Sequence, residues 1–126
     1  MKNILFYLGI GFLFTHELDA ISNNEWLILP IVNLLPVKLA EITFVLAHIP
    51  LFAVLVALIA SPNQRVQLKT KFWLSVFLVS HGILHAIFMG HDDYEFSSWV
   101  SNLLIFGGAL FGLSYLLLNR VSNRFN

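Results

Sequence analysis

Four long apolar runs constrain this chain more than any other feature of its sequence. They cover residues 3–22, 39–60, 72–90 and 98–118. A helix that crosses a bilayer needs about 20 mainly apolar residues, and each run reaches or approaches that length. Only 11% of the residues are charged, 58% are hydrophobic, and the mean hydropathy is +0.80. Because a soluble domain carries about 25% charged residues, the sequence predicts a chain that lies in a lipid bilayer.

We expect one all-α domain over residues 1–126, a polytopic membrane protein built as a four-transmembrane-helix bundle. The connection between the first two helices is unusual, because residues 26–32 are almost entirely apolar. Pro30 lies within this stretch and Pro36 follows it, and the stretch is too short to span. The pattern predicts a short interfacial segment between helices 1 and 2 that covers the outer half of the bundle.

The basic residues predict the orientation. One side of a four-span bundle would carry Lys2, Arg65, Lys69, Lys71, Arg120 and Arg124, and the other side would carry Lys38. By the positive-inside rule, both termini are then cytoplasmic, and all acidic residues lie in or beyond the outer half. The basic residues are scattered, which argues against a nucleic-acid partner. The chain has no cysteine, so thiolate metal ligands are excluded.

Ionisable residues interrupt three of the four runs. They are His16, Glu17 and Asp19 in the first, Glu41 and His48 in the second, and His81 and His85 in the third. Ionisable groups inside a membrane are costly and usually mark a functional site. A rise of about 1.5 Å per residue places them in a column about 10 Å tall. We therefore expect them to meet inside the bundle.

The sequence predicts a metal site in this column. His81 and His85 are four residues apart on one helix face, a spacing that can bind one ion. The expected ligands are His16, Asp19, Glu41, His48, His81 and His85, and this donor set favours Zn or Fe. Glu17 and Glu25 are expected to move protons. Such a centre suits a metal-dependent membrane enzyme that acts on a lipid or isoprenoid-like substrate from the outer leaflet.

Two other interpretations remain open at the level of the sequence, so enzymatic activity is not decided there. In the first, His48 and one of His81 or His85 ligate haem b in an electron-transfer module. In the second, the polar column only holds the helices of a non-catalytic membrane subunit together. Gly108 and Gly112 are explained equally by an oligomer contact and by packing within the chain.

Three motifs carry a resemblance to a known family. They are Phe-Thr-His-Glu-Leu-Asp-Ala at 14–20 followed by Glu25-Trp26, Ala-His-Ile-Pro at 47–50, and His-Gly-Ile-Leu-His at 81–85. Over essentially its whole length the chain resembles a family of small bacterial four-helix membrane proteins of unknown function. It is more loosely similar to the HxxEE-type membrane proteins, although His16-Glu17-Leu18-Asp19 has a single acid at its fourth place, where that pattern has paired glutamates. The resemblance implies a multi-pass protein of the bacterial cytoplasmic (inner) membrane.

Overall fold

Four long α-helices make up most of the protein. The computed structural model describes residues 1–92 and 94–122. The helices are α1 (Lys2–Ser22), α2 (Val37–Ile59), α3 (Gln64–Phe88) and α4 (Trp99–Ser122), with two short 3-10 helices, η1 (Glu25–Leu27) and η2 (Val32–Leu34), between α1 and α2. All four α-helices are long and apolar enough to cross a membrane, and the described residues form no strand. The prediction of an all-α four-helix membrane bundle is confirmed.

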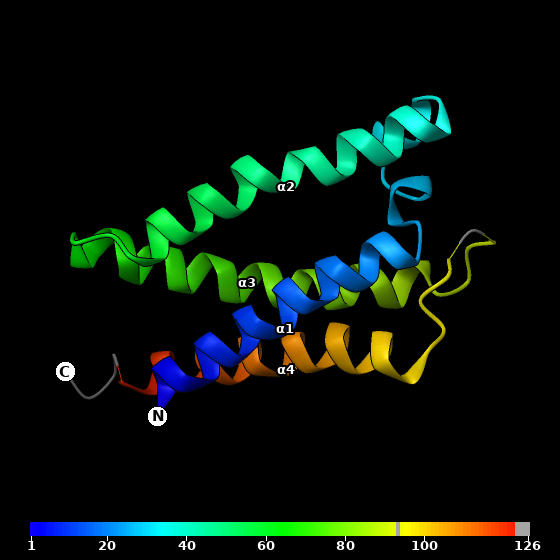
Figure 1. Cartoon of the computed structure of the whole chain (residues 1–126). Coiled ribbons are helices and arrows are strands. Elements are labelled where there is room, and N and C mark those ends of the chain that lie inside the picture. The colour runs from blue at the N-terminus through cyan, green and yellow to red at the C-terminus, as the bar shows by residue number, and fades with distance from the viewer. Residues whose placement is uncertain (93, 123–126) are drawn as a thin grey trace.

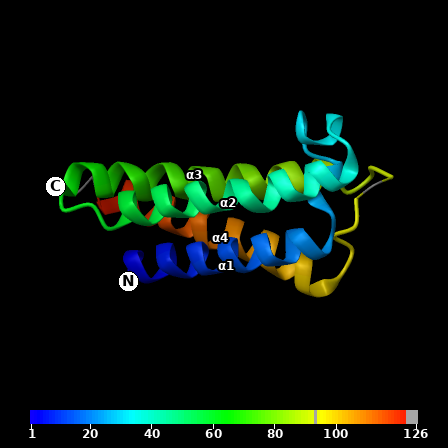
Figure 2. The same cartoon turned by 45° about the horizontal axis from the view of Figure 1, so that its top comes forward.

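Successive helices run in opposite directions, so α1 begins and α4 ends at the same end of the bundle (Figure 1). We call this the terminal end. Residues 23–36, which contain η1 and η2, lie at the opposite end in both views and are called the lid segment below (Figures 1 and 2). The end of the bundle that carries them is the lid end. The helix α4 packs against both α1 and α3, and these three helices form the core of the bundle.

The helix α2 is bound much less tightly. Within α2, all of which the structure describes, only Ala40 and Phe44 are buried. It stays close to α3 near the turn that joins them and leans away from it toward the lid end (Figure 1). The mean hydropathy of its most apolar window is 2.6, the highest of the four helices. A helix that is hydrophobic on all sides and little buried by protein is suited to contact with lipid.

Glycines allow the close approach of the core helices. A Cβ atom added at Gly82 of α3 would lie 2.7 Å from Ala109 Cβ, and one at Gly112 of α4 would lie 2.8 Å from Ser75 O. Gly108 and Gly112 are buried against α1 and α3. The small residues of α4 therefore serve packing within the chain, which is one of the two roles expected for them.

The lid segment packs onto the bundle rather than extending from it. Trp26 is 4% exposed and lies in a cluster with Ala20, Ala40 and Phe44. The Trp26 and Phe44 ring centroids are 5.8 Å apart. This packing carries the preceding residue, Glu25, into the lid end of the bundle, where it is buried.

The helix α3 begins eight residues earlier than the expected range 72–90, at Gln64. Asn63 caps it, because its side-chain oxygen accepts hydrogen bonds from the amides of Arg65 and Val66. Residues 64–71 are mostly polar but favour helix formation. Hydropathy marks the part of a helix that suits lipid, and it misses a polar first turn or two.

Candidate metal centre

Three histidines from two helices form the most concentrated polar group within the membrane-spanning helices. His16 lies on α1, and His81 and His85 lie one turn apart on α3. One ring nitrogen from each lies within 4.8 Å of the others. The His16 ring centroid is 4.9 Å from those of both His81 and His85, and the latter two are 4.5 Å apart. Three imidazoles this close can bind one ion after small side-chain movements.

Glu25 brings a carboxylate from the lid segment close to two of the three rings, those of His16 and His85. Its Oε2 atom is 3.8 Å from His16 Nε2, and its Oε1 atom is 4.0 Å from His85 Nε2. Burial, and then the nearby Glu17 and Asp19 carboxylates, raise the pKa of Glu25 to about 8. The group holds a proton at neutral pH unless a cation lies close to it, because a cation favours the ionised form. We call His16, His81, His85 and Glu25 the histidine cluster.

Several atoms of the histidine cluster are buried without a hydrogen-bond partner. They are both ring nitrogens of His16, Nε2 of His81 and Oε2 of Glu25. Leaving a buried polar atom unpaired costs about 1–3 kcal/mol. So many unpaired atoms in one place require an explanation. A cation between the rings would give a partner to one nitrogen of each ring and to the carboxylate.

Aromatic side chains surround the histidine cluster. The hydroxyl of Tyr94 lies 3.2 Å from His85 Nδ1. When His85 donates its Nδ1 proton to this oxygen, the Nε2 lone pair is left for a ligand. Phe77 stacks on His81 with a centroid distance of 5.4 Å, and Phe96 contacts the rings of both His16 and His85. These contacts fix the ring orientations.

A second polar pair joins α1 to α2. Glu17 Oε2 is 2.8 Å from His48 Nε2, and His48 Nδ1 is 2.7 Å from the carbonyl oxygen of Phe44. A carbonyl oxygen can only accept, so Nδ1 is the donor in that bond. Both nitrogens of His48 are therefore engaged by protein atoms, and the residue pairs with Glu17 rather than with the histidine cluster.

The structure brings together half of the six expected metal ligands, namely His16, His81 and His85. Glu41 is exposed on α2 and lies apart from them. Glu41 and His48 are seven residues apart and share one face of α2, but they lie about 10 Å apart along its axis. Glu41 lies near the lid end of α2, where this helix leans away from α3 (Figure 1). Asp19 is half-buried and its Oδ2 atom has no partner, but it belongs to no group close enough to share an ion among the described residues.

A family model matches residues 2–122, which include all four helices, the histidine cluster and the Glu17–His48 pair. Its description is Family of unknown function (DUF6713). The chain belongs to this family. The resemblance to an uncharacterised family, stated above from three motifs, is confirmed. No curated protein and no solved structure matches the chain. The function of this DUF6713 protein must therefore be argued from its own side chains.

A cavity of about 230 Å³ opens beside the histidine cluster, between the lid segment and α3. Glu25, His81 and His85 line it together with apolar side chains, among them Leu29 and Leu84. An apolar molecule in this cavity would contact both the carboxylate and two of the imidazoles.

Sequence reasoning missed one member of this site, Tyr94, to which it gave no role there. It placed Glu25 in a proton-transfer role without predicting its contact with the histidines. Both residues lie in connections between helices, where no periodic pattern predicts side-chain direction. The burial of Trp26 is the feature that positions Glu25, and the apolar character of residues 26–32 was its only signal in the sequence.

Proposed function

We propose that the protein is a membrane-embedded metalloenzyme in which His16, His81 and His85 hold one Zn or Fe ion. The observation that carries the proposal is the convergence of three imidazoles and a buried carboxylate with unpaired polar atoms. Three histidines with further positions left open form a donor set used by catalytic zinc sites.

The bound ion would supply Lewis acidity and a water of lowered pKa. Glu25 faces both the histidines and the 230 Å³ cavity, so it can hold or move a proton where the two meet. Tyr94 positions His85, and Phe77 and Phe96 fix the ring orientations. Each of these side chains thus has a distinct role around the proposed ion.

The substrate in this proposal is a lipid or isoprenoid-like molecule. The cavity beside the histidine cluster is lined mostly by apolar side chains, and it lies next to the lid segment. The basic residues Lys2, Arg65, Lys69 and Arg120 lie toward the terminal end, which supports an orientation with both termini in the cytoplasm of a bacterium. The lid end then faces outward, and the substrate enters from the outer leaflet of the inner membrane.

The haem b alternative has less support. His48 already uses both ring nitrogens, one with Glu17 and one with Phe44. His81 and His85 contact each other and His16 edge to face, and a porphyrin plane would need to separate such rings.

The test is the metal content of the protein purified in lipid nanodiscs and measured by elemental mass spectrometry. We expect about one Zn or Fe ion per chain, as for a mononuclear site. The His81→Ala/His85→Ala double variant should lose it. The matched control is His48→Ala, which removes a membrane histidine outside the cluster and should keep the ion. Wild-type protein with far less than one ion per chain, or a double variant that keeps its ion, contradicts the proposal.

A further inference from the structure

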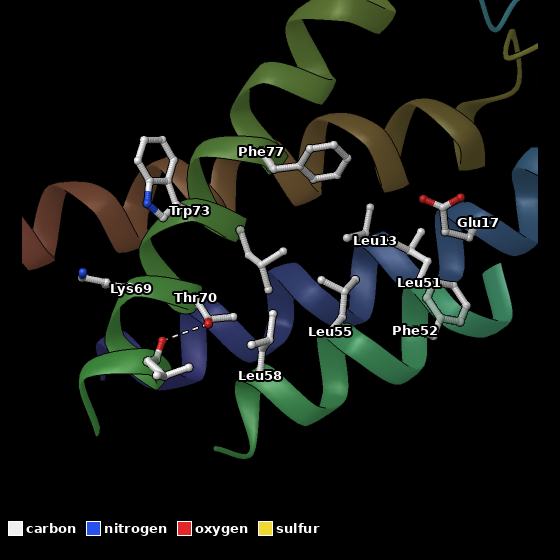
Figure 3. Close-up of a pocket in the computed structure, with 12 residues that line it drawn as sticks. Leu13, Glu17, Leu51, Phe52, Leu55, Leu58, Lys69, Thr70, Trp73 and Phe77 are labelled. Carbon is white, nitrogen blue, oxygen red and sulfur yellow. Dashed lines mark hydrogen bonds between the residues drawn. The ribbon is translucent and has the colours of Figure 1, made fainter. Parts of the chain in front are cut away.

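A second and larger cavity, of about 440 Å³, lies between α1, α2 and α3 (Figure 3). Its walls are mainly leucine and aromatic side chains, including Leu13 of α1, Leu55 and Leu58 of α2, and Phe77 of α3. The volume is within the range of small-molecule sites. None of its lining residues also lines the cavity beside the histidine cluster. It is therefore a separate site that the proposed function does not use.

One end of this cavity is polar. Figure 3 shows the Glu17 carboxylate at that end, near Leu13 and Leu51. His48 holds the Oε2 atom, and Phe44 holds His48 in turn. The other oxygen, Oε1, takes no hydrogen bond within the part of the chain that the structure describes. Because Nδ1 of His48 donates to Phe44, the bond between Nε2 and Oε2 needs a second proton, carried by either residue of the pair. In both cases the open Oε1 presents a hydrogen-bond acceptor to whatever fills the cavity.

The rest of the cavity is an apolar slot. Along α3 its lining extends from Val66 to Phe77, a rise of about 16 Å. Lys69 is exposed, and its ammonium group points away from the other labelled side chains in Figure 3. The slot thus offers apolar walls, the Glu17 acceptor at one end and the Thr70 hydroxyl, whose proton is donated to the Val66 carbonyl, but no inward-pointing cation for an anionic head group.

We propose that this cavity binds an uncharged long-chain alcohol, with its chain along the leucines and its hydroxyl donating to Glu17 Oε1. A hydrocarbon chain alone would bury the carboxylate oxygen without a partner, which is unfavourable. A charged head group would lose its hydration at this depth. Phe77 lines the slot and also stacks on His81, so the bound chain lies one ring away from the histidine cluster. The inference needs no metal ion and goes beyond the proposed function.

Tryptophan quenching in nanodiscs tests this inference. Trp73 lines the cavity, and Trp26→Phe with Trp99→Phe leaves it as the only tryptophan. A brominated long-chain alcohol that binds in the cavity should quench the fluorescence of Trp73 in a saturable manner. This saturable quenching adds to a linear component, which comes from alcohol dissolved in the lipid. The brominated alkane of equal length should show only the linear part. Leu55→Phe fills the slot and should remove saturation. Its matched control is Val54→Phe, the exposed neighbour on α2, which should keep it.

Variants of the polar groups identify what is recognised. Glu17→Leu should weaken alcohol binding about tenfold or more, the loss expected for a hydrogen bond to a charged group. Glu17→Gln keeps an acceptor oxygen and should bind within a few-fold of wild type. Lys69→Gln should change nothing. An alkane that saturates like the alcohol, or a fatty acid that binds more tightly than the alcohol, overturns the proposal even if Glu17→Leu fails to fold.

Metal content measured on the same samples separates the two proposals. Chelator-stripped protein should still bind the alcohol. If the protein binds the alcohol but never holds metal, the metalloenzyme proposal is refuted and the cavity proposal stands. If it holds metal but shows no saturable alcohol binding, the cavity proposal is refuted and the metalloenzyme proposal stands.

Discussion

Tyr94→Phe removes one hydroxyl from the edge of the histidine cluster and keeps the aromatic ring. The hydroxyl oxygen is 3.2 Å from His85 Nδ1, where it can accept the proton of the liganding ring. Loss of an outer hydrogen bond to a liganding histidine typically costs 10- to 100-fold in metal affinity. Because this bond is at the long end of the range, we expect a loss of about tenfold, or roughly 1.4 kcal/mol.

Competition between the protein in nanodiscs and a chelator of known zinc affinity measures this loss directly. The matched control is Tyr7→Phe, which removes the hydroxyl of a half-exposed tyrosine of α1 that takes no part in the cluster. Its affinity for zinc should equal that of wild type. If Tyr94→Phe binds zinc as tightly as wild type, Tyr94 is only an aromatic anchor, and the reasoning about ring orientation is refuted.

Three further predictions concern packing, pH and the residues left outside the cluster. Gly82→Ala should lower the free energy of unfolding by about 1–3 kcal/mol, because its new methyl group would lie 2.7 Å from Ala109 Cβ. The control Gly11→Ala, whose new methyl group has nothing within 4 Å, should be neutral or stabilising. Unfolding in mixed micelles measures both variants, and equal effects would contradict the packing argument. Zinc affinity should rise as the pH increases toward about 8, because the bound cation favours ionised Glu25 and zinc binding at lower pH must release the proton of Glu25. The affinity of Glu25→Gln should rise less steeply with pH. An identical slope for the two proteins would exclude Glu25 from the site. Glu41→Ala should keep its full metal content in elemental analysis, because Glu41 is exposed on α2, and a loss of metal would show that α2 turns inward when the ion binds.

The four helices were predictable because hydropathy reports directly on contact with lipid. The residues at which the helices begin and end were less predictable. Residues 64–71 extend α3 beyond its apolar run, since they are polar and yet helical. The lid segment was predictable as a feature because an apolar stretch too short to span must find another apolar surface, and Trp26 finds it against Phe44.

The histidine cluster was predictable in part, for a reason specific to each helix. His81 and His85 share a face through their spacing, and His16 lies at a similar depth on a helix that packs in the core. The expectation for Glu41 and His48 assumed that α2 packs as tightly as the others. It does not: α2 leans away from α3 toward the lid end, which leaves Glu41 exposed, and His48 pairs with Glu17. Depth and face along a helix can be counted from the sequence, but how closely the helix packs against its neighbours cannot.

X-ray absorption at the metal edge of the zinc-loaded protein tests the central claim most directly. If His16, His81 and His85 share one ion, the spectrum should show three imidazole nitrogens at about 2.0–2.1 Å, and His16→Ala should reduce that number by one. A first shell made only of oxygen atoms, or an imidazole count that His16→Ala leaves unchanged, would contradict the claim.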